Sequence, residues 1–228
     1  MSDKDQPVTP RASASVIIVR AVGSQLEVLL VQRNANIKFH SGAWVFPGGK
    51  VDPTDIEQNA NGDENSLARI AAIRETQEEV GITLEATALT PFSHWLTPVQ
   101  QPKRFSTWFF VAAVDGDVNP VIDESEIVDH IWLSPQEALE KQISKELILP
   151  PPTFVSLTKL LTLESTQNID TFVSNLGFEK FAPRIVENDL GRIALYHGDA
   201  GFEQVDAEIP GARHRLMMLK SGWKYINS

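Results

Sequence analysis

Three glutamates that precede a glycine are the residues of this sequence whose types and spacing best suit chemistry. Glu75, Glu78 and Glu79 stand at positions i, i+3 and i+4, so a helix would present all three on one face. Clustered carboxylates repel one another, and a hard divalent cation such as Mg²⁺ or Mn²⁺ relieves that repulsion through oxygen ligands. Gly81 then supplies a residue type that commonly ends a helix. The run 74–82 (RETQEEVGI) therefore predicts a divalent-metal site suited to phosphate chemistry.

The same three carboxylates could instead form a solvated acidic helix face, as most short charge runs do. Two neighbouring features favour the metal site. The stretch 46–49 (FPGG) contains two glycines, whose backbone can take positive φ and approach a ligand closely. Arg74 directly precedes the first glutamate of the run, where it can hold a carboxylate in place. A solvated acidic helix would need neither the two glycines nor the arginine.

The combined pattern resembles the Nudix box, Gly-x5-Glu-x7-Arg-Glu-aliphatic-x-Glu-Glu-x-Gly-aliphatic, whose members hydrolyse diphosphates linked to another moiety. The helical half matches at six of seven fixed positions, with Thr76 in place of an aliphatic residue. Between Gly49 and Arg74 lie 24 residues where the box has 13, which is an insertion of 11. The isolated glutamate of the box has two candidate counterparts. Asp55 has the right offset from Gly49, and Ser66 has the right offset from Arg74.

Segments outside the box resemble one Nudix subgroup, the animal peroxisomal coenzyme A diphosphatases with an enlarged Nudix box and their bacterial relatives. The segments that carry this resemblance are 39–49, the enlarged box 49–82, 95–98 with 103–110, and 149–153. The resemblance implies hydrolysis of coenzyme A or acyl-coenzyme A at the diphosphate. The alternatives are a pyrophosphatase acting on ADP-ribose, dinucleotides or nucleotide sugars, and a Nudix fold kept only as a ligand-binding module.

The resemblance also implies roles for individual residues. The glutamates of the helix would hold Mg²⁺ or Mn²⁺ together with the Gly48 carbonyl, and Arg74 would fix a glutamate by a bidentate pair. The general base is left open between Glu126 and Glu146. Cations and aromatic side chains that border the strands could contact the substrate, although strand aromatics more often form core. The expected residues are Arg74, Glu78, Glu79, Glu126 and Glu146 for catalysis; Arg33, Gly49, Arg104 and Phe105 for substrate binding; and Gly48, Glu75, Glu78 and Glu79 for the metal.

Composition limits the function classes that suit this chain. The 228 residues carry a formal net charge of −10, which argues against nonspecific nucleic-acid binding because that binding needs a basic surface. The absence of cysteine excludes disulfides and thiolate metal sites. The polar N-terminus and the lack of an 18-residue apolar run indicate neither export nor a membrane span. We expect a cytoplasmic protein that binds a small nucleoside diphosphate-linked substrate, with a homodimer compatible with the resemblance.

Hydrophobic patterning predicts the elements that would position these residues. Apolar and β-branched runs predict strands at 14–20, 26–33, 43–47, 87–96, 105–114 and 127–133. The polar stretch 52–65 predicts a surface loop, after which Asn65 or Ser66 could cap the acidic helix. Ser134, Pro135 and Glu137 predict a helix start with a capping box. Further helices are expected at 153–163 and 169–176, and a hairpin is expected at 184–196.

Together these elements predict an α/β (α+β) fold, which by resemblance is the Nudix α/β/α sandwich with a mixed, curved sheet. We expect a flexible N-terminal tail over residues 1–12 and a Nudix core over residues 13–150. A helical and hairpin extension over residues 151–228 is expected to pack on that core.

Overall fold

A computed structural model describes residues 8–23, 25–36, 40–60, 62–163 and 165–228, which form two compact units. The sandwich unit comprises residues 12–93 and 107–179, and the hairpin unit comprises 94–106, 180–228 and the described part of 1–11. Helices α4 (Pro151–Leu160) and α5 (Ile169–Leu176) belong to the sandwich unit. The compact units therefore divide the chain elsewhere than at the expected boundary near residue 150. The predicted tail 1–12 lies mostly outside the described residues, and strand β1 already begins at Arg11.

The predicted strands form, and they join one sheet that is eight-stranded among the described residues. Its order is β3-β2-β1-β6-β5-β8, with β4 paired to β1 and β7 paired to β2. The bounds are β1 Arg11–Val22, β2 Gln25–Arg33, β3 Trp44–Val45, β4 Gly48–Lys50, β5 Thr90–Leu96, β6 Phe105–Ala113, β7 Ile127–Leu133 and β8 Glu179–Phe181. Strands β1 and β2 pair antiparallel. Hydrogen bonds from Arg11 to Arg104 and from Val114 to Val19 make β1 and β6 parallel, so the predicted mixed sheet is confirmed.

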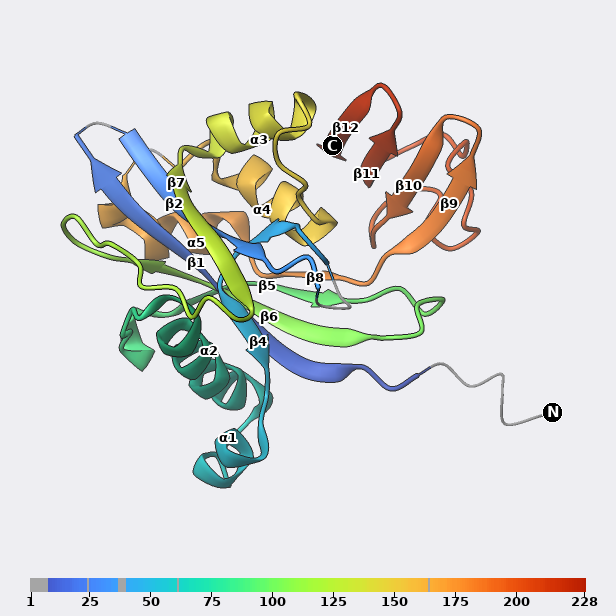
Figure 1. Ribbon diagram of the computed structural model, residues 1–228. Helices are drawn as coiled ribbons and strands as arrows, with labels where there is room; N and C mark the ends of the chain where they lie inside the picture. Colours follow the sequence, from blue (N-terminus) through green and yellow to red (C-terminus); the bar gives the residue numbers. More distant parts are fainter. Residues whose placement is uncertain (1–7, 24, 37–39, 61, 164) are drawn as a thin grey trace. The chain divides into compact units, whose positions relative to one another are not determined.

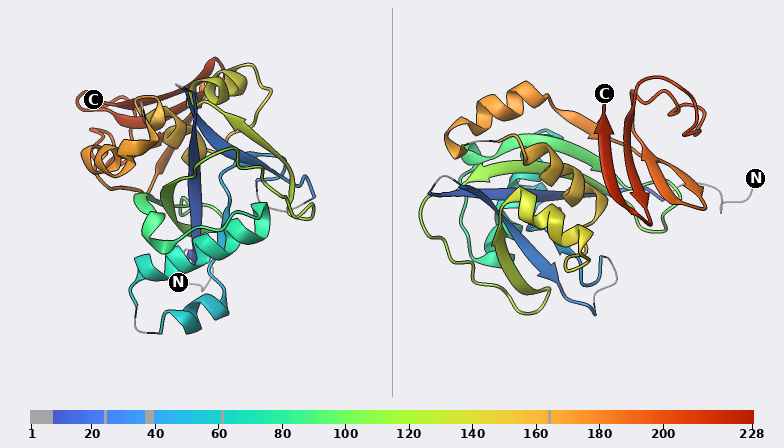
Figure 2. Two further views of the ribbon diagram at one scale, coloured as in Figure 1. Left: turned by 90° about the vertical axis from the view of Figure 1, so that its left-hand side faces the viewer. Right: turned by 90° about the horizontal axis from the view of Figure 1, so that it is seen from above.

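The core of the sandwich unit lies between the sheet and helix α2 (Glu64–Val80) (Figure 1). Alternate residues of β1, including Val16 and Ile18, are fully buried in this layer because strand side chains point to opposite faces in turn. Small side chains at Ala68, Ala71 and Ala72 let α2 lie close to the strands. Helices α3 (Pro135–Ile143), α4 and α5 lie on the opposite face of the sheet, and the turned views show the same layers (Figure 2). The arrangement is the predicted α/β/α sandwich.

Two predictions about the segment before α2 were wrong. Residues 52–65 are not all loop, since Pro53–Gln58 forms helix α1 with Asp52 as its N-cap and a capping box to Asp55. Helix α2 is capped by Asp63, whose carboxylate accepts the Ser66 N–H at 2.8 Å, rather than by Asn65 or Ser66. Short polar helices with buried anchors give weak periodic signals, so the composition of this segment concealed α1.

Other helix boundaries agree more closely with the sequence predictions. Gly81 ends α2 with a left-handed φ of 68°, and Ser134 begins α3 with the predicted capping box. Helix α5 has the predicted bounds, and α4 begins two residues before the predicted 153. Two 3-10 turns, Ala86–Ala88 and Thr166–Asn168, precede β5 and α5. Among the described residues, no helix is long and apolar enough to cross a bilayer.

The hairpin unit contains a four-stranded antiparallel sheet in the order β12-β11-β10-β9. Its strands are β9 Arg184–Asn188, β10 Gly191–Leu195, β11 His214–Leu219 and β12 Gly222–Asn227. The first pair is the predicted hairpin, whereas the second pair was not predicted. A buried ion pair between Arg215 and Asp199, with N to O distances of 2.7 Å, fixes the long connection from β10 to β11.

Candidate functional site

Glu79 is a buried carboxylate at the last turn of α2, where its side chain meets Gly48, the first residue of β4. Only 5% of the residue is exposed, and its Oε2 accepts the Gly48 N–H at 2.8 Å. Gly48 has a φ of +147°, and a Cβ there would lie 2.3 Å from the Ala14 carbonyl oxygen, so only glycine fits. The sequence groups Glu79 with Glu75 and Glu78 on one helix face. In the structure Glu79 lies on the buried side of α2 with Thr76 and Ala72, which are one and two turns earlier.

Glu75 lies one turn before Glu79 and packs directly on Gly49. A Cβ added to Gly49 would lie 2.3 Å from the Glu75 carboxyl carbon, so the missing side chain makes room for this carboxylate. Burial raises the pKa of Glu75 above its ordinary value, while Arg74 acts in the opposite direction. The two glycines of the FPGG stretch therefore serve two different glutamates: one donates a hydrogen bond, and the other leaves space.

The positive charge near Glu79 is too small to offset the cost of burying its ionised carboxylate. Burial raises the pKa of Glu79 to about 8, against the opposing effects of the Gly48 hydrogen bond and of Arg33. Arg33 Nη1 lies 4.0 Å from Glu79 Oε1, which is beyond hydrogen-bond distance. Glu75 and Glu126 repel the Glu79 charge and raise its pKa further. A bound cation would therefore restore the ionised form of Glu79.

Arg74 connects the acidic helix to β4 and α1. Its Nε and Nη2 contact the two Asp55 carboxylate oxygens at 3.0 and 2.9 Å, and Nη2 also donates to the Lys50 carbonyl. Its Nη1 contacts Glu75 at 3.1 Å and Glu78 at 2.9 Å. The expected bidentate pair of Arg74 therefore forms with Asp55, and the contacts to the helix glutamates come from the remaining nitrogen.

Asp55 supplies the carboxylate that sequence comparison left unassigned. Its residue is fully buried, and it also accepts the Asp52 N–H at 2.8 Å. Burial alone would raise the pKa of Asp55, but hydrogen bonds from Arg74 and Asp52 outweigh that effect and hold the pKa below its ordinary value. Ser66 is occupied at the first turn of α2, where it donates its N–H to Asp63. Of the two candidates, the structure brings only Asp55 to Arg74, and the offset of Asp55 from Gly49 is the signal that identified it.

Two carboxylates form a donor set that fits the divalent cation that the sequence predicts. Glu75 and Glu79 are both turned to the glycine pair, and Arg33 Nε is buried near them without a hydrogen-bond partner among the described residues. Magnesium commonly takes one or two carboxylates and completes its shell with water and substrate phosphate, so this pair fits. Glu78 is 59% exposed at its side chain and pairs with Arg74. Among the described residues, no three aspartate, glutamate, histidine or cysteine side chains are grouped so that they could hold a metal ion.

The two candidates for the general base have different surroundings. Glu126 follows the loop before β7, and its Oε2 lies 3.9 Å from Arg33 Nη2, which brings it to the same arginine as Glu79. Glu146 follows α3 and is tied to Lys141 Nζ at 2.7 Å and to Ser144 Oγ at 2.7 Å. The structure therefore groups Glu126, but not Glu146, with the carboxylate pair.

Arg104 and Phe105 belong to the hairpin unit. Arg104 donates to the Thr97 carbonyl at 3.1 Å and to the Val8 carbonyl at 2.9 Å. The Phe105 N–H donates to Thr97 Oγ1 at 3.0 Å. Both residues thus support the loop between β5 and β6. Their expected contact with substrate stays a prediction.

Comparison with known proteins decides the family. The sequence profile of the NUDIX domain matches residues 9–150, which is more than half of the chain. The chain belongs to the NUDIX family. The matched range includes β4, α1, α2 and β7, so it contains the Nudix residues described above.

The named relatives include diphosphatases. The acyl-coenzyme A diphosphatase of Xenopus laevis is 25% identical over 288 residues, covering 85% of this chain and 76% of that protein. The human acyl-coenzyme A diphosphatase is 34% identical over 122 residues, covering 51% of this chain and 32% of that protein. A Caenorhabditis elegans nudix relative is 31% identical over 187 residues, and the match spans 60% of its length.

A solved structure supports the Nudix fold independently. The crystal structure of a NUDIX hydrolase from Alicyclobacillus acidocaldarius superposes with a TM-score of 0.64 at 23% identity, covering 72% of this chain and 96% of that chain. Similarity at this identity shows the fold and not the substrate. The predicted fold class is confirmed by this comparison.

Proposed function

We propose that this chain is a metal-dependent Nudix hydrolase that cleaves the diphosphate bond of coenzyme A or acyl-coenzyme A. The observation that carries the hydrolase part is the pair Glu75 and Glu79 set against Gly48 and Gly49, with Glu79 buried. The substrate part is supported by the names of the relatives from Xenopus laevis and human. It is also supported by the resemblance of the flanking segments and the enlarged box.

Each residue of the site has a distinct part in this proposal. Glu75 and Glu79 are the principal metal ligands, and the Gly48 carbonyl and Glu78 are the further donors. When bound, Mg²⁺ or Mn²⁺ would neutralise diphosphate charge and lower the pKa of a bound water. Arg74 positions Glu75 and Glu78 through its anchor on Asp55.

The reaction also needs a base and a contact for the leaving phosphate. Glu126 is the preferred base because it reaches the same arginine as Glu79, whereas Glu146 is held by Lys141. Arg33 can turn its unsatisfied Nε to a phosphate oxygen when substrate enters, which removes the cost of a buried unpaired donor. In the same proposal Gly49 lies beside the diphosphate. The substrate contacts expected of Arg104 and Phe105 stay predictions. A cytoplasmic location and a homodimer stay predictions.

Product analysis tests the activity and the substrate class together. The purified chain is incubated with Mg²⁺ or Mn²⁺ and, in parallel, with coenzyme A, acetyl-coenzyme A, ADP-ribose and NADH, and the products are identified by mass. We expect adenosine 3′,5′-bisphosphate from the first two. Cleavage of ADP-ribose or NADH alone would contradict the coenzyme A assignment. Binding without cleavage of any of the four would contradict catalysis itself.

A matched pair of variants tests the metal ligand. Glu79→Gln should retain less than about a tenth of the wild-type rate, because an amide cannot replace a charged oxygen ligand. Glu64→Gln changes an exposed glutamate at the opposite end of the same helix and should keep the wild-type rate. Equal loss in both variants would point to a defect of the helix rather than of the site.

A further inference from the structure

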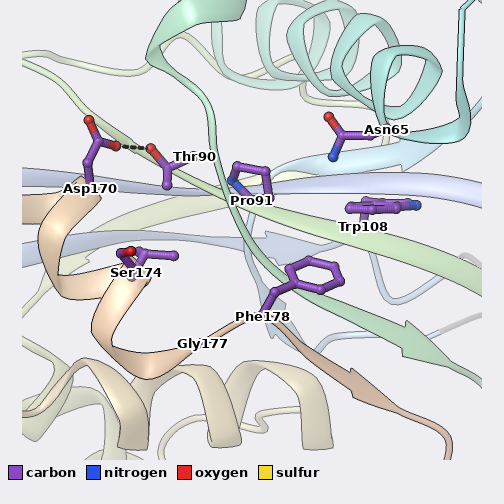
Figure 3. Close-up of a pocket in the computed structure, with 9 residues that line it drawn as sticks. Asn65, Thr90, Pro91, Trp108, Asp170, Ser174, Gly177 and Phe178 are labelled. Atoms are coloured by element: carbon purple, nitrogen blue, oxygen red, sulfur yellow. Dashed lines mark hydrogen bonds between the residues drawn. The ribbon is translucent and has the colours of Figure 1, made fainter.

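A cavity of about 570 Å³ lies in the sandwich unit at the opposite end of α2 from Glu79 (Figure 3). Residues of α2, β5, β6 and α5 line it. Asn65, its contribution from α2, precedes Glu79 by 14 residues, so the two lie about 20 Å apart along the helix axis at about 1.5 Å per residue. The volume falls in the range of about 300–1,000 Å³ that is usual for small-molecule sites. None of the residues that line this cavity belongs to the carboxylate site.

Aromatic rings form one wall of the cavity. Trp108 of β6 and Phe178, which follows α5, stack with centroids 5.1 Å apart and planes 29° from parallel. Trp108 also stacks on Phe110, whose ring is fully buried, so the indole is held from behind. Phe178 is 41% exposed, which is unusual for a large apolar side chain that already has an aromatic partner. Trp108 therefore has an aromatic ring on each side, and the exposed Phe178 ring is the surface on which a planar ring could stack.

Polar groups surround that wall and are only partly used within the protein. Asn65 accepts the Arg69 Nε–H at 2.8 Å through Oδ1, which leaves its amide nitrogen as a donor, and Figure 3 shows that nitrogen on the cavity side. Asp170 accepts a hydrogen bond from Thr90 through one oxygen and keeps the other as an acceptor. Ser174 follows Asp170 by one turn of α5 and adds a hydroxyl that can donate or accept.

The charge of the lining excludes an anionic ligand. Asp170 is the one ionisable residue among those that line the cavity in the described part of the chain. Arg69 lies close by, but its Nη1 donates to the carbonyls of Ala86 and Leu89, and its guanidinium lies 5.1 Å above the Phe110 ring. The Arg69 guanidinium is therefore held by contacts within the protein. A diphosphate would meet a carboxylate here and no free cation, so this cavity is distinct in chemistry from the carboxylate site.

We propose that this cavity binds the planar base of an uncharged nucleoside, with adenosine as the matching example. The base would stack on the Phe178 ring, and the Asn65 amide would donate to a ring nitrogen of the base. The Asp170 carboxylate would make the site unfavourable for a phosphate group. The site would fill whether or not metal or substrate occupies the carboxylate site. The proposal therefore does not depend on the proposed hydrolase activity, and it is tested by binding alone.

Calorimetry and NMR titration of the full chain with adenosine provide the test. Phe178→Ala should weaken adenosine binding at least about fivefold, since base stacking on an aromatic ring is commonly worth that much or more. Leu190→Ala, which changes an exposed apolar residue of the hairpin unit, should leave binding unchanged. If the alanine variant does not fold, Phe178→Leu keeps an apolar side chain and should weaken adenosine binding in the same direction.

Charge discrimination gives a second, independent readout. Adenosine 5′-monophosphate should bind more weakly than adenosine. Asp170→Asn should reduce this difference in affinity, because it removes the repulsion between the carboxylate and the phosphate. Adenosine affinity should be the same with and without Mn²⁺ and in Glu79→Gln. The proposal is overturned if millimolar adenosine gives no heat or shift, or if Phe178→Ala and Phe178→Leu bind like the wild type. It is also overturned if the monophosphate binds more tightly than adenosine.

Discussion

Replacing Glu79 by Gln in the metal-free chain should raise the stability of the protein at alkaline pH. Burial holds the pKa of Glu79 at about 8, against an ordinary value of 4.5. The folded state therefore binds more protons than the unfolded state between these values, and the free energy of unfolding falls as pH rises through that window. Glutamine keeps the shape and can still accept the Gly48 N–H, but it does not ionise.

The size of the effect follows from linkage. One unit of pKa corresponds to about 1.4 kcal/mol. Because Glu79 ionises more readily in the unfolded chain, the free energy of unfolding of the wild type is lowered by about 2 kcal/mol at pH 6 and about 5 kcal/mol at pH 9. Urea unfolding with a chelator should therefore show a variant advantage that widens by about 3 kcal/mol between these two pH values. Glu64→Gln, at the exposed start of the same helix, should show no such widening.

Two results would refute this reasoning. A stability difference between Glu79→Gln and wild type that changes by less than about 1 kcal/mol from pH 6 to pH 9 would mean that Glu79 is not held in its neutral form. Added Mn²⁺ should stabilise the wild type by mass action and leave the variant nearly unchanged. Equal stabilisation of both proteins would place the metal elsewhere.

Three further predictions concern single side chains. Asp55→Asn should destabilise the chain by about 3 kcal/mol in urea unfolding and lower turnover, because it leaves Arg74 without its buried carboxylate. Gly49→Ala should weaken Mn²⁺ binding in calorimetry at least tenfold while the chain stays folded, since its methyl group would lie 2.3 Å from the Glu75 carboxyl carbon. Asp199, whose pKa is held at about 2 by its buried arginine partner, stabilises the chain above pH 4 and loses that effect as pH falls through 2; Asp199→Asn should cost about 2 kcal/mol at pH 7 but little at pH 2 in urea unfolding.

Local chemistry made most of the sandwich unit predictable. Strands with strong apolar runs, the capping box at Ser134 and the left-handed Gly81 all have signals that lie within a few residues of the element. Helix α1 and strands β11 and β12 lacked such signals. Helix α1 depends on a carboxylate buried against Arg74, and the second hairpin depends on pairing between distant segments. Both are tertiary effects that periodicity does not report.

The candidate site was predictable in its residue types but not in their orientation. The spacing of the glutamates placed Glu75 and Glu79 on one helix, and the glycines identified the turn that meets them. Spacing alone could not show that Glu79 is buried while Glu78 faces Arg74, because that depends on how α2 is rotated against the sheet. It also could not choose between Glu126 and Glu146, since the distance of each from Arg33 is set by loops.

The Asp55 to Arg74 pair has a consequence for how such chains are recognised and altered. Two hydrogen bonds hold Arg74 to Asp55. The eleven additional residues lie between these two fixed residues and need not disturb either one. Loop-closure entropy grows slowly, by about 0.6 kcal/mol for each doubling of length, so the connection between α1 and α2 can lengthen or shorten at little cost. A search that fixes the number of residues between the glycine and the arginine would miss this chain. A search for the acid six residues after the glycine, with a free gap to the arginine, would find it.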